Sequence, residues 1–179
     1  MTRLRPVRTV DEIPVEYRNT PIGLLFEYHN MGRSDAAYDE AKLLVGMCMD
    51  NRKRLNIPEN FAYVIRTGGA NLQYSDFKIS FAVGVGNVQH LAVMGHNHCG
   101  MVNLVGKKEQ FISGLVSNAG WSRNKAEEHF ASLAPLFEIQ NETEFVLSQV
   151  ERLKNKYPKI CIVPLFYDVD DNQIYLVEE

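Results

Sequence analysis

The sequence predicts an α/β fold, with a mostly parallel central sheet of four to five strands flanked by helices. Apolar runs of strand length alternate with longer segments of helical pattern, which is typical of parallel α/β sheets. A content of 45% hydrophobic and 23% charged residues is that of a chain that buries a core. The length of 179 residues suits one domain, so we expect a single domain over residues 1–179 with an N-terminal arm at about residues 1–34.

The N-terminal part is expected to be irregular and only partly helical. Residues 11–31 contain two prolines, which interrupt regular structure, together with an apolar patch. A short helix capped by Ser34 or Asp35 should follow. The first buried strand comes next, at residues 42–49, where the run LLVGMCM is apolar throughout.

Two further strands and a helix are predicted in the middle of the chain. Residues 62–66 and 90–95 have the pattern of strands, the second of them buried. A turn at residues 67–70 follows the first of these. The helix begins at a Ser75-Asp76 cap, runs to about residue 85 and ends at Gly86.

The C-terminal half is predicted to be helical and then to close with a hairpin. Polar, charged segments with helical pattern occupy residues 107–117, 122–134 and 142–156. Two strands follow, at residues 159–167 and 173–177, and the turn at residues 168–172 joins them as a hairpin.

Charge and apolar runs exclude several classes of protein. Nineteen basic and 22 acidic residues leave a net charge of -3, and the pI is near 6.0, so nucleic acid is not an expected partner. No apolar run approaches the roughly 18 residues of a membrane span, and no secretory signal follows the N-terminal arginines. Three cysteines are an odd number, which disfavours a disulfide framework. We expect a cytoplasmic protein without membrane contact.

Two short segments follow buried strands at their carboxyl ends, where diverging loops of an open α/β sheet leave room for ligands. The first is CMDNR, at residues 48–52. If it stays extended, Cys48, Asp50 and Arg52 project toward one side. The second is HNHCG, at residues 96–100, in which a turn brings a ring nitrogen and a sulfur together.

Two thiolates and one imidazole form a donor set that suits Zn²⁺, so Cys48, His96 and Cys99 are the candidate ligands. Three protein ligands with a fourth position for water or a carboxylate are typical of catalytic zinc, and the chain has no CxxC pair of the structural kind. His98 is an alternative fourth ligand, although a ligand adjacent to Cys99 would strain a tetrahedral site. A lone cysteine is usually a small buried hydrophobe, which is our interpretation of Cys161.

Three motifs, in this order, resemble those of the β-class carbonic anhydrases. They are C-x-D-x-R at residues 48–52, R-x-G-G at residues 66–69 and H-x-x-C-G at residues 96–100. The surrounding succession of strands and helices matches from about residue 20 to residue 179. The resemblance implies a zinc lyase that hydrates CO₂ reversibly to bicarbonate and a proton by a zinc-bound hydroxide. It also implies a homodimer or higher homo-oligomer, to which an N-terminal helical arm contributes.

The resemblance also implies roles for individual residues. Cys48, His96 and Cys99 would ligate the zinc, and Asp50 with Arg52 would form a dyad beside it. Zinc lowers the pKa of a bound water toward ~7, whereas two thiolates oppose that shift, so an oriented dyad is needed. Two arrangements of Asp50 stay open: paired with Arg52, or bound to the metal in a closed form. An ordinary ion pair is the alternative interpretation of the dyad.

The surroundings of the site leave substrate choice open. Gly69 and Gly100 are expected at the substrate pocket, where glycine lets the backbone approach the metal. The segment at residues 53–65 is several residues shorter than in the family, and Thr67 stands where asparagine is usual. Hydrolysis of COS or CS₂ on the same zinc site is therefore an alternative activity, and a non-catalytic zinc- or bicarbonate-binding protein is another.

The remaining histidines have no partners that the sequence reveals. His29, His90 and His129 are expected to lie at the surface or to be satisfied by hydrogen bonds. A proton relay from the site to solvent is a further role for His29 or His98, because a pKa near ~6.5 suits that task.

Overall fold

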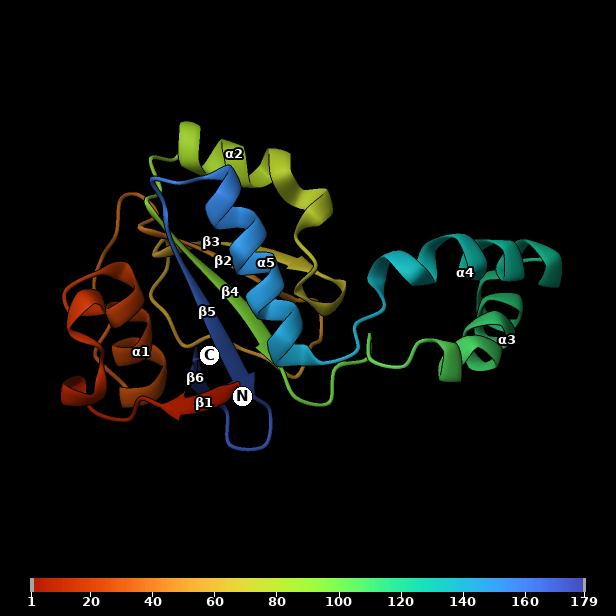
Figure 1. Cartoon of the computed structure of the whole chain (residues 1–179), viewed down its shortest axis with the longest axis horizontal. Helices are drawn as coiled ribbons and strands as arrows, with labels where there is room; N and C mark the ends of the chain where they lie inside the picture. Colours follow the sequence, from red (N-terminus) through yellow and green to blue (C-terminus); the bar gives the residue numbers. More distant parts are fainter. Residues whose placement is uncertain (1, 179) are drawn as a thin grey trace.

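The computed structural model of the chain describes residues 2–178, and within them six strands form one sheet (Figure 1). The strands are β1 (Arg3–Pro6), β2 (Leu43–Cys48), β3 (Ala62–Thr67), β4 (His90–His96), β5 (Cys161–Asp168) and β6 (Gln173–Glu178). Their spatial order is β1-β6-β5-β4-β2-β3. The strands β5, β4, β2 and β3 run parallel to one another. Strand β6 pairs with β5, and β1 pairs with β6, both in antiparallel orientation. The predicted α/β class with a mostly parallel sheet is confirmed.

Helices cover both faces of this sheet. Those that pack on it are α1 (Pro21–Met31), α2 (Asp76–Gly84) and α5 (Glu142–Lys156), whereas α3 (Lys108–Ala119) and α4 (Arg123–Phe137) lie away from it (Figure 1). Alternate residues of β2 face opposite sides, as the period of a strand requires. Val45 packs in the same buried cluster as Phe26 of α1, whereas Leu44 packs with Ile79 of α2 and Val150 of α5. Among residues 2–178, none of the helices combines the length and apolar character needed to cross a bilayer.

The helices α3 and α4 form a hairpin that projects away from the sheet (Figure 1). The rings of Phe111 and Phe130 meet edge to face with their centroids 5.3 Å apart, and Gly120 turns the chain with a φ of 68°. Lys107 anchors the root of the hairpin, because its Nζ donates to the carbonyl oxygens of Gly100 and Val102 at 2.7 and 2.8 Å. The hairpin is thereby tied to the loop that follows β4.

The N-terminal part differs from its prediction. A complete helix, α1, begins after the Thr20 cap with proline at its first position, so this region is more regular than expected. The helix expected after Ser34 or Asp35 is wrong: residues 33–42, all of which the structure describes, form no helix. The reason is that α1 ends at Gly32 in the left-handed region, after which the chain runs without regular structure to β2.

The sheet also has one strand more than predicted. β1 has only four residues and none is fully buried, so no apolar run or clear alternation marks it in the sequence. It is held by its backbone pairing with β6. Elsewhere the expected strands and helices are present with ends within three residues of those predicted, and the C-terminal hairpin of β5 and β6 is as expected.

Candidate metal centre

The carboxyl ends of two neighbouring strands place the first two candidate ligands. Cys48 is the last residue of β2 and His96 is the last residue of β4, and these strands pair in parallel along their length. After His96 the chain turns sharply, with His98 at a φ of 53°. This turn returns Cys99 toward the sheet, so parallel pairing and one tight turn together assemble the three side chains.

The donor atoms of Cys48, His96 and Cys99 all lie within 4.8 Å of one another. The two Sγ atoms are 4.0 Å apart, far longer than the ~2.05 Å of a disulfide bond. All three residues are buried, with exposures of 3%, 1% and 5% respectively. The structure therefore brings the three predicted ligands into one compact, water-poor cluster.

The ring of His96 is held with one nitrogen left for a ligand. Nδ1 lies 2.8 Å from the carbonyl oxygen of Asn97, which can only accept, so Nδ1 carries the proton and Nε2 has a free lone pair. Nε2 is buried and has no hydrogen-bond partner among residues 2–178. A buried acceptor without a partner costs roughly 1–3 kcal/mol. This orphaned atom beside two thiols fits a tetrahedral zinc with His and Cys ligands.

The two thiols influence each other's ionisation. A hydrogen bond from the Cys99 thiol holds the pKa of Cys48 well below its ordinary value. The hydrogen bond to Cys48, together with burial, raises the pKa of Cys99. Cys48 thus forms the thiolate readily, whereas Cys99 keeps its proton as long as no positive charge is close to the two sulfur atoms. Metal binding supplies such a charge, because the thiolate is the form that ligates.

Asp50 and Arg52 form a close ion pair beside the cluster. The Arg52 side chain donates from Nη2 to Oδ2 at 2.6 Å and from Nε to Oδ1 at 3.0 Å. These hydrogen bonds lower the pKa of Asp50, so it is ionised. Arg52 Nη2 also donates to the carbonyl oxygen of His98 at 2.8 Å, which links the two loops of the site.

The expected extended conformation of this segment is wrong. β2 ends at Cys48, and the backbone N–H of Arg52 donates to Oδ1 of Asp50 at 3.0 Å, which closes a turn. Asp50 and Arg52 therefore meet through the turn and not along one wall of a strand. Of the two arrangements left open for Asp50, the structure has the one in which it pairs with Arg52.

The two glycines predicted at the pocket have different surroundings. Gly69 has a φ of 63°, and a Cβ there would lie 3.3 Å from Cβ of Met101. Met101 packs against the cluster formed by Cys48 and Cys99, so Gly69 backs an apolar wall of the centre. Gly100 is exposed, and a Cβ there would meet nothing within 4 Å. Only Gly69 is packed against that wall.

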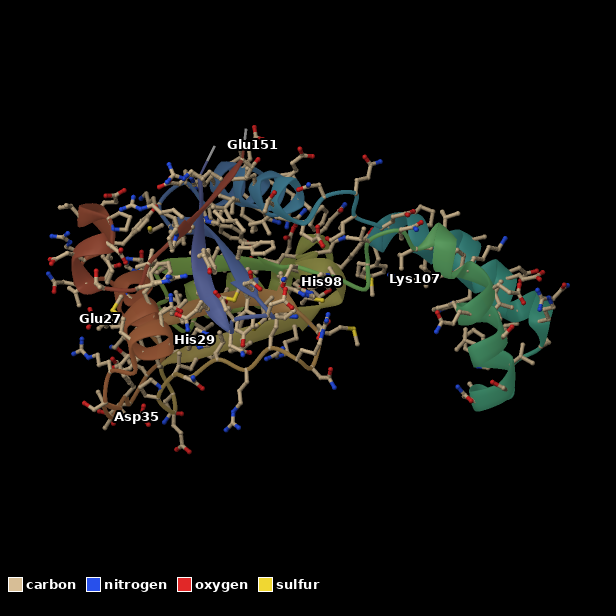
Figure 2. All side chains as sticks on the ribbon, turned by 90° about the horizontal axis from the view of Figure 1, so that it is seen from below. Glu27, His29, Asp35, His98, Lys107 and Glu151 are labelled. Atoms are coloured by element: carbon tan, nitrogen blue, oxygen red, sulfur yellow. The ribbon has the colours of Figure 1, made fainter. Side chains whose placement is uncertain are left out.

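The loop between His96 and Cys99 is tied to the turn between β5 and β6. Asn97 Nδ2 donates to Oδ1 of Asp168 at 2.9 Å and to Oδ2 of Asp170 at 2.8 Å. His98 is exposed and its Nε2 lies 3.2 Å from Oδ2 of Asp170, so its ring is outside the ligand cluster (Figure 2). These acidic residues were not identified from the sequence, because their proximity depends on the pairing of β4 with β5.

The other histidines are satisfied or packed among aromatic rings. His29 is buried; the backbone N–H of Asn56 donates to its Nδ1, and its Nε2 lies 3.0 Å from the carbonyl oxygen of Asn172. Burial lowers the pKa of His29, so the ring is a neutral structural link; it belongs to α1 and lies apart from His98 (Figure 2). His129 packs between Phe111 and Trp121. Cys161 is partly buried against the core.

A lysine beside the centre also escaped sequence reasoning. Lys53 is only 2% exposed, although it lies in the polar segment KRLN, where a solvated side chain is the usual interpretation. Arg66, the first residue of the R-x-G-G motif, lies next to it and donates to the backbone carbonyl oxygens of Cys48 and Lys53 at 3.3 and 3.0 Å. No pattern in the sequence distinguishes this buried lysine from the surface lysines.

Comparisons with known proteins find similar folds and a matching family. No curated protein sequence matches the chain significantly. A β-carbonic anhydrase from Trichomonas vaginalis superposes with a TM-score of 0.64 at 16% identity, covering 80% of this chain and 87% of that one. For a carbonic anhydrase from Streptococcus mutans the TM-score is 0.61 at 17% identity, with 93% and 100% covered. An apo carbon disulfide hydrolase gives a TM-score of 0.54 at 21% identity, with 75% and 77% covered.

At identities of 16–21%, the structural similarity shows only that these proteins share a fold with this chain. The sequence model of the carbonic anhydrase family matches residues 45–171, which is more than half of the chain and includes Cys48, His96 and Cys99. The structural neighbours include β-class enzymes. The chain belongs to the β-class of the carbonic anhydrase family.

Proposed function

We propose that the protein catalyses the zinc-dependent, reversible hydration of CO₂ to bicarbonate and a proton. The observation that carries the proposal is the buried, unpartnered Nε2 of His96 facing two thiols. An ionised carboxylate, Asp50, lies beside it and is fixed by Arg52. Membership of the carbonic anhydrase family supports the same activity.

The residues of the chain have distinct tasks in this proposal. Cys48, His96 and Cys99 would hold the zinc, which when bound supplies Lewis-acid activation of water near neutral pH. Asp50 accepts a hydrogen bond from the attacking oxygen and so orients it toward the carbon of CO₂. Arg52 keeps that carboxylate ionised and fixed in direction through two parallel hydrogen bonds. The hydrogen bond between His96 and the Asn97 carbonyl fixes the ring for ligation.

Stopped-flow measurement of CO₂ hydration by the zinc-loaded protein, between about pH 6.5 and 9, tests the proposal. We expect a rate well above that of buffer which rises with pH, because the reaction needs deprotonated water. A protein that holds zinc and shows no hydration at any of these pH values would instead be a non-catalytic zinc- or bicarbonate-binding relative.

A second candidate activity is hydrolysis of COS or CS₂ on the same site. A cavity of about 290 Å³ with an almost entirely apolar lining shares one wall residue, Met101, with the cluster of Cys48 and Cys99. Its walls include Met49, Met101, Leu104, Phe111 and Phe137. Small apolar molecules suit such a space, and one of the similar structures is described as a carbon disulfide hydrolase. Release of H₂S from COS and CS₂, measured on the sample used for CO₂, distinguishes the two activities by their kcat/KM.

We further propose that the protein is a single-domain homodimer in the cytoplasm. The edge strand β3 exposes Tyr63 and Val64, and the adjoining α2 exposes Phe77 at 83% and Phe81 at 51%. Such a contiguous apolar face is a common protein interface, and a second copy of the chain would bury it. Sedimentation analysis should show a dimer that Phe77→Glu weakens. A reducing compartment keeps the two ligand thiols free.

A further inference from the structure

Lys53 is a buried cation without an anionic side chain as partner. Its ammonium group makes one long hydrogen bond, from Nζ to the backbone carbonyl oxygen of Asp50 at 3.4 Å. Among residues 2–178, no carboxylate oxygen lies within the 4.0 Å of an ion pair with Nζ. A buried ammonium of this kind is costly and persists only where nearby charge compensates it.

Negatively charged groups near Lys53 offset part of this cost when no metal is bound. Burial lowers the pKa of Lys53, whereas the negative charges of Cys48, Asp50 and Cys99 act in the opposite direction. Arg66 adds a second cation to the same region, since its Nη1 lies 3.3 Å from the Cys48 carbonyl oxygen. Lys53 and Arg66 therefore both contact the backbone of the segment at residues 48–50, which begins with the candidate ligand Cys48.

The charges of the loaded site show what Lys53 contributes. Two thiolates cancel the charge of a divalent metal, and Asp50 with Arg52 forms a neutral pair. Arg66 is exposed and its charge is screened by water, so without Lys53 the buried part of the centre would be neutral and would attract anions weakly. A unit charge that is buried beside the segment carrying Cys48 and Asp50 acts strongly on it, because screening by water is weak there.

We propose that Lys53 is a positioning residue that gives the metal centre its fixed positive charge and so strengthens the binding of small anions there, bicarbonate in particular. The inference rests on the proposed function, because it assumes a metal held by Cys48, His96 and Cys99. The positive charge of Lys53 is one that neither the three ligands nor the neutral pair of Asp50 and Arg52 supplies.

The test compares Lys53→Met with the wild type, both loaded with Co²⁺ in place of zinc. Methionine keeps the length and apolar stem of the side chain and removes the charge. Thiocyanate and bicarbonate are titrated against the visible absorption of the cobalt. We expect full cobalt content and a Kd for both anions that is roughly tenfold higher in the variant. Lys159→Met, at an exposed lysine, is the matched control and should leave both values unchanged.

Unchanged anion affinity in a fully loaded Lys53→Met protein would overturn the inference. Removal of a buried charge is expected to preserve folding, and Lys53→Gln, which retains polarity, provides a second neutral variant. A wild type that binds cobalt and anions but does not hydrate CO₂ would contradict the proposed function alone. A wild type that binds no cobalt would contradict both.

Discussion

The contacts of single residues prepare the centre for a metal. Hydrogen bonding to Asn97 fixes the tautomer of His96, and the Cys99 thiol favours ionisation of Cys48. Arg52 fixes Asp50 and also contacts the loop that carries Cys99, through the His98 carbonyl oxygen. The hydrogen bonds made with Asn97 and by Arg52 leave the donor atoms of the three candidate ligands free.

Replacement of Asp50 by Asn should separate catalysis from metal binding. The amide keeps the shape of the side chain but loses the charge that accepts the hydrogen bond, so we expect CO₂ hydration to fall on the order of 10²-fold or more. Zinc content should stay at one ion per chain, because Asp50 pairs with Arg52 and is not a ligand in this structure. Stopped-flow rates and zinc analysis on one preparation measure both quantities. Full activity in the variant would exclude the assigned role, and Asp35→Asn, at an exposed aspartate, is the control.

Residue types and spacing predicted the ligand cluster, because the carboxyl ends of parallel strands share one edge of the sheet, where side chains from neighbouring strands meet. They did not predict the conformation of the dyad. An aspartate two residues before an arginine N–H closes a turn as easily as it continues a strand, and the choice depends on where β2 stops pairing. The burial of Lys53 was equally hidden, since it depends on tertiary packing around the centre.

At the scale of elements, pairing order decides which loops meet. β2 and β4 are neighbours although β3 lies between them in sequence, so the loops after Cys48 and His96 converge. The buried strands were predictable because their apolar runs are unbroken. β1 was not, since its four residues gain their place only from β6, whose own position depends on the hairpin with β5.

Close packing of α5 on β4 predicts a stability difference between two glycine variants. A Cβ on Gly95 would lie 2.6 Å from Cγ2 of Val146, so Gly95→Ala should lower the free energy of unfolding by ~1–3 kcal/mol. Gly84→Ala, at the end of α2, meets open space and should leave stability unchanged or raise it by up to ~1 kcal/mol. Urea unfolding measures both. Equal effects of the two substitutions would contradict the packing described for α5.

Asp76 of α2 forms ion pairs with Arg152 and Lys156 of α5, so its contribution to the free energy of unfolding should depend on pH. Burial raises its pKa, but hydrogen bonds from Lys156 and Arg152 outweigh this and lower it. A lowered folded-state pKa stabilises the protein above the unfolded value of ~3.9, and the stabilisation is lost as the pH falls through the folded value. Asp76→Asn should therefore cost ~1 kcal/mol or less at pH 7, given partial exposure, and less at pH 3, which is below the unfolded value.

Urea unfolding of the Asp76→Asn variant at the two pH values measures this difference. Glu128→Gln, at an exposed glutamate for which the structure records no ion pair, is the matched control. A cost that is the same at both pH values would show that the ion pairs do not link the two helices.

At the scale of the whole molecule, the candidate metal centre lies at the carboxyl ends of β2 and β4, and the hairpin of α3 and α4 projects away from the sheet (Figure 1). Lys107 at the hairpin root is bonded to the loop after Cys99, and the apolar cavity lies between this hairpin and the centre. The sequence predicted each helix but not the projection, because the hairpin buries few residues and no local pattern sets its direction. Substrate access is expected along the apolar side of this junction.

The most direct test of the central claim is the CO₂ hydration rate of one preparation, followed by stopped flow as zinc is removed by a chelator and then restored. If Cys48, His96 and Cys99 hold the catalytic ion, the rate should fall with zinc content and return in proportion to it, up to one ion per chain. A rate that survives complete removal of zinc, or no rate with one ion bound per chain, would contradict the account.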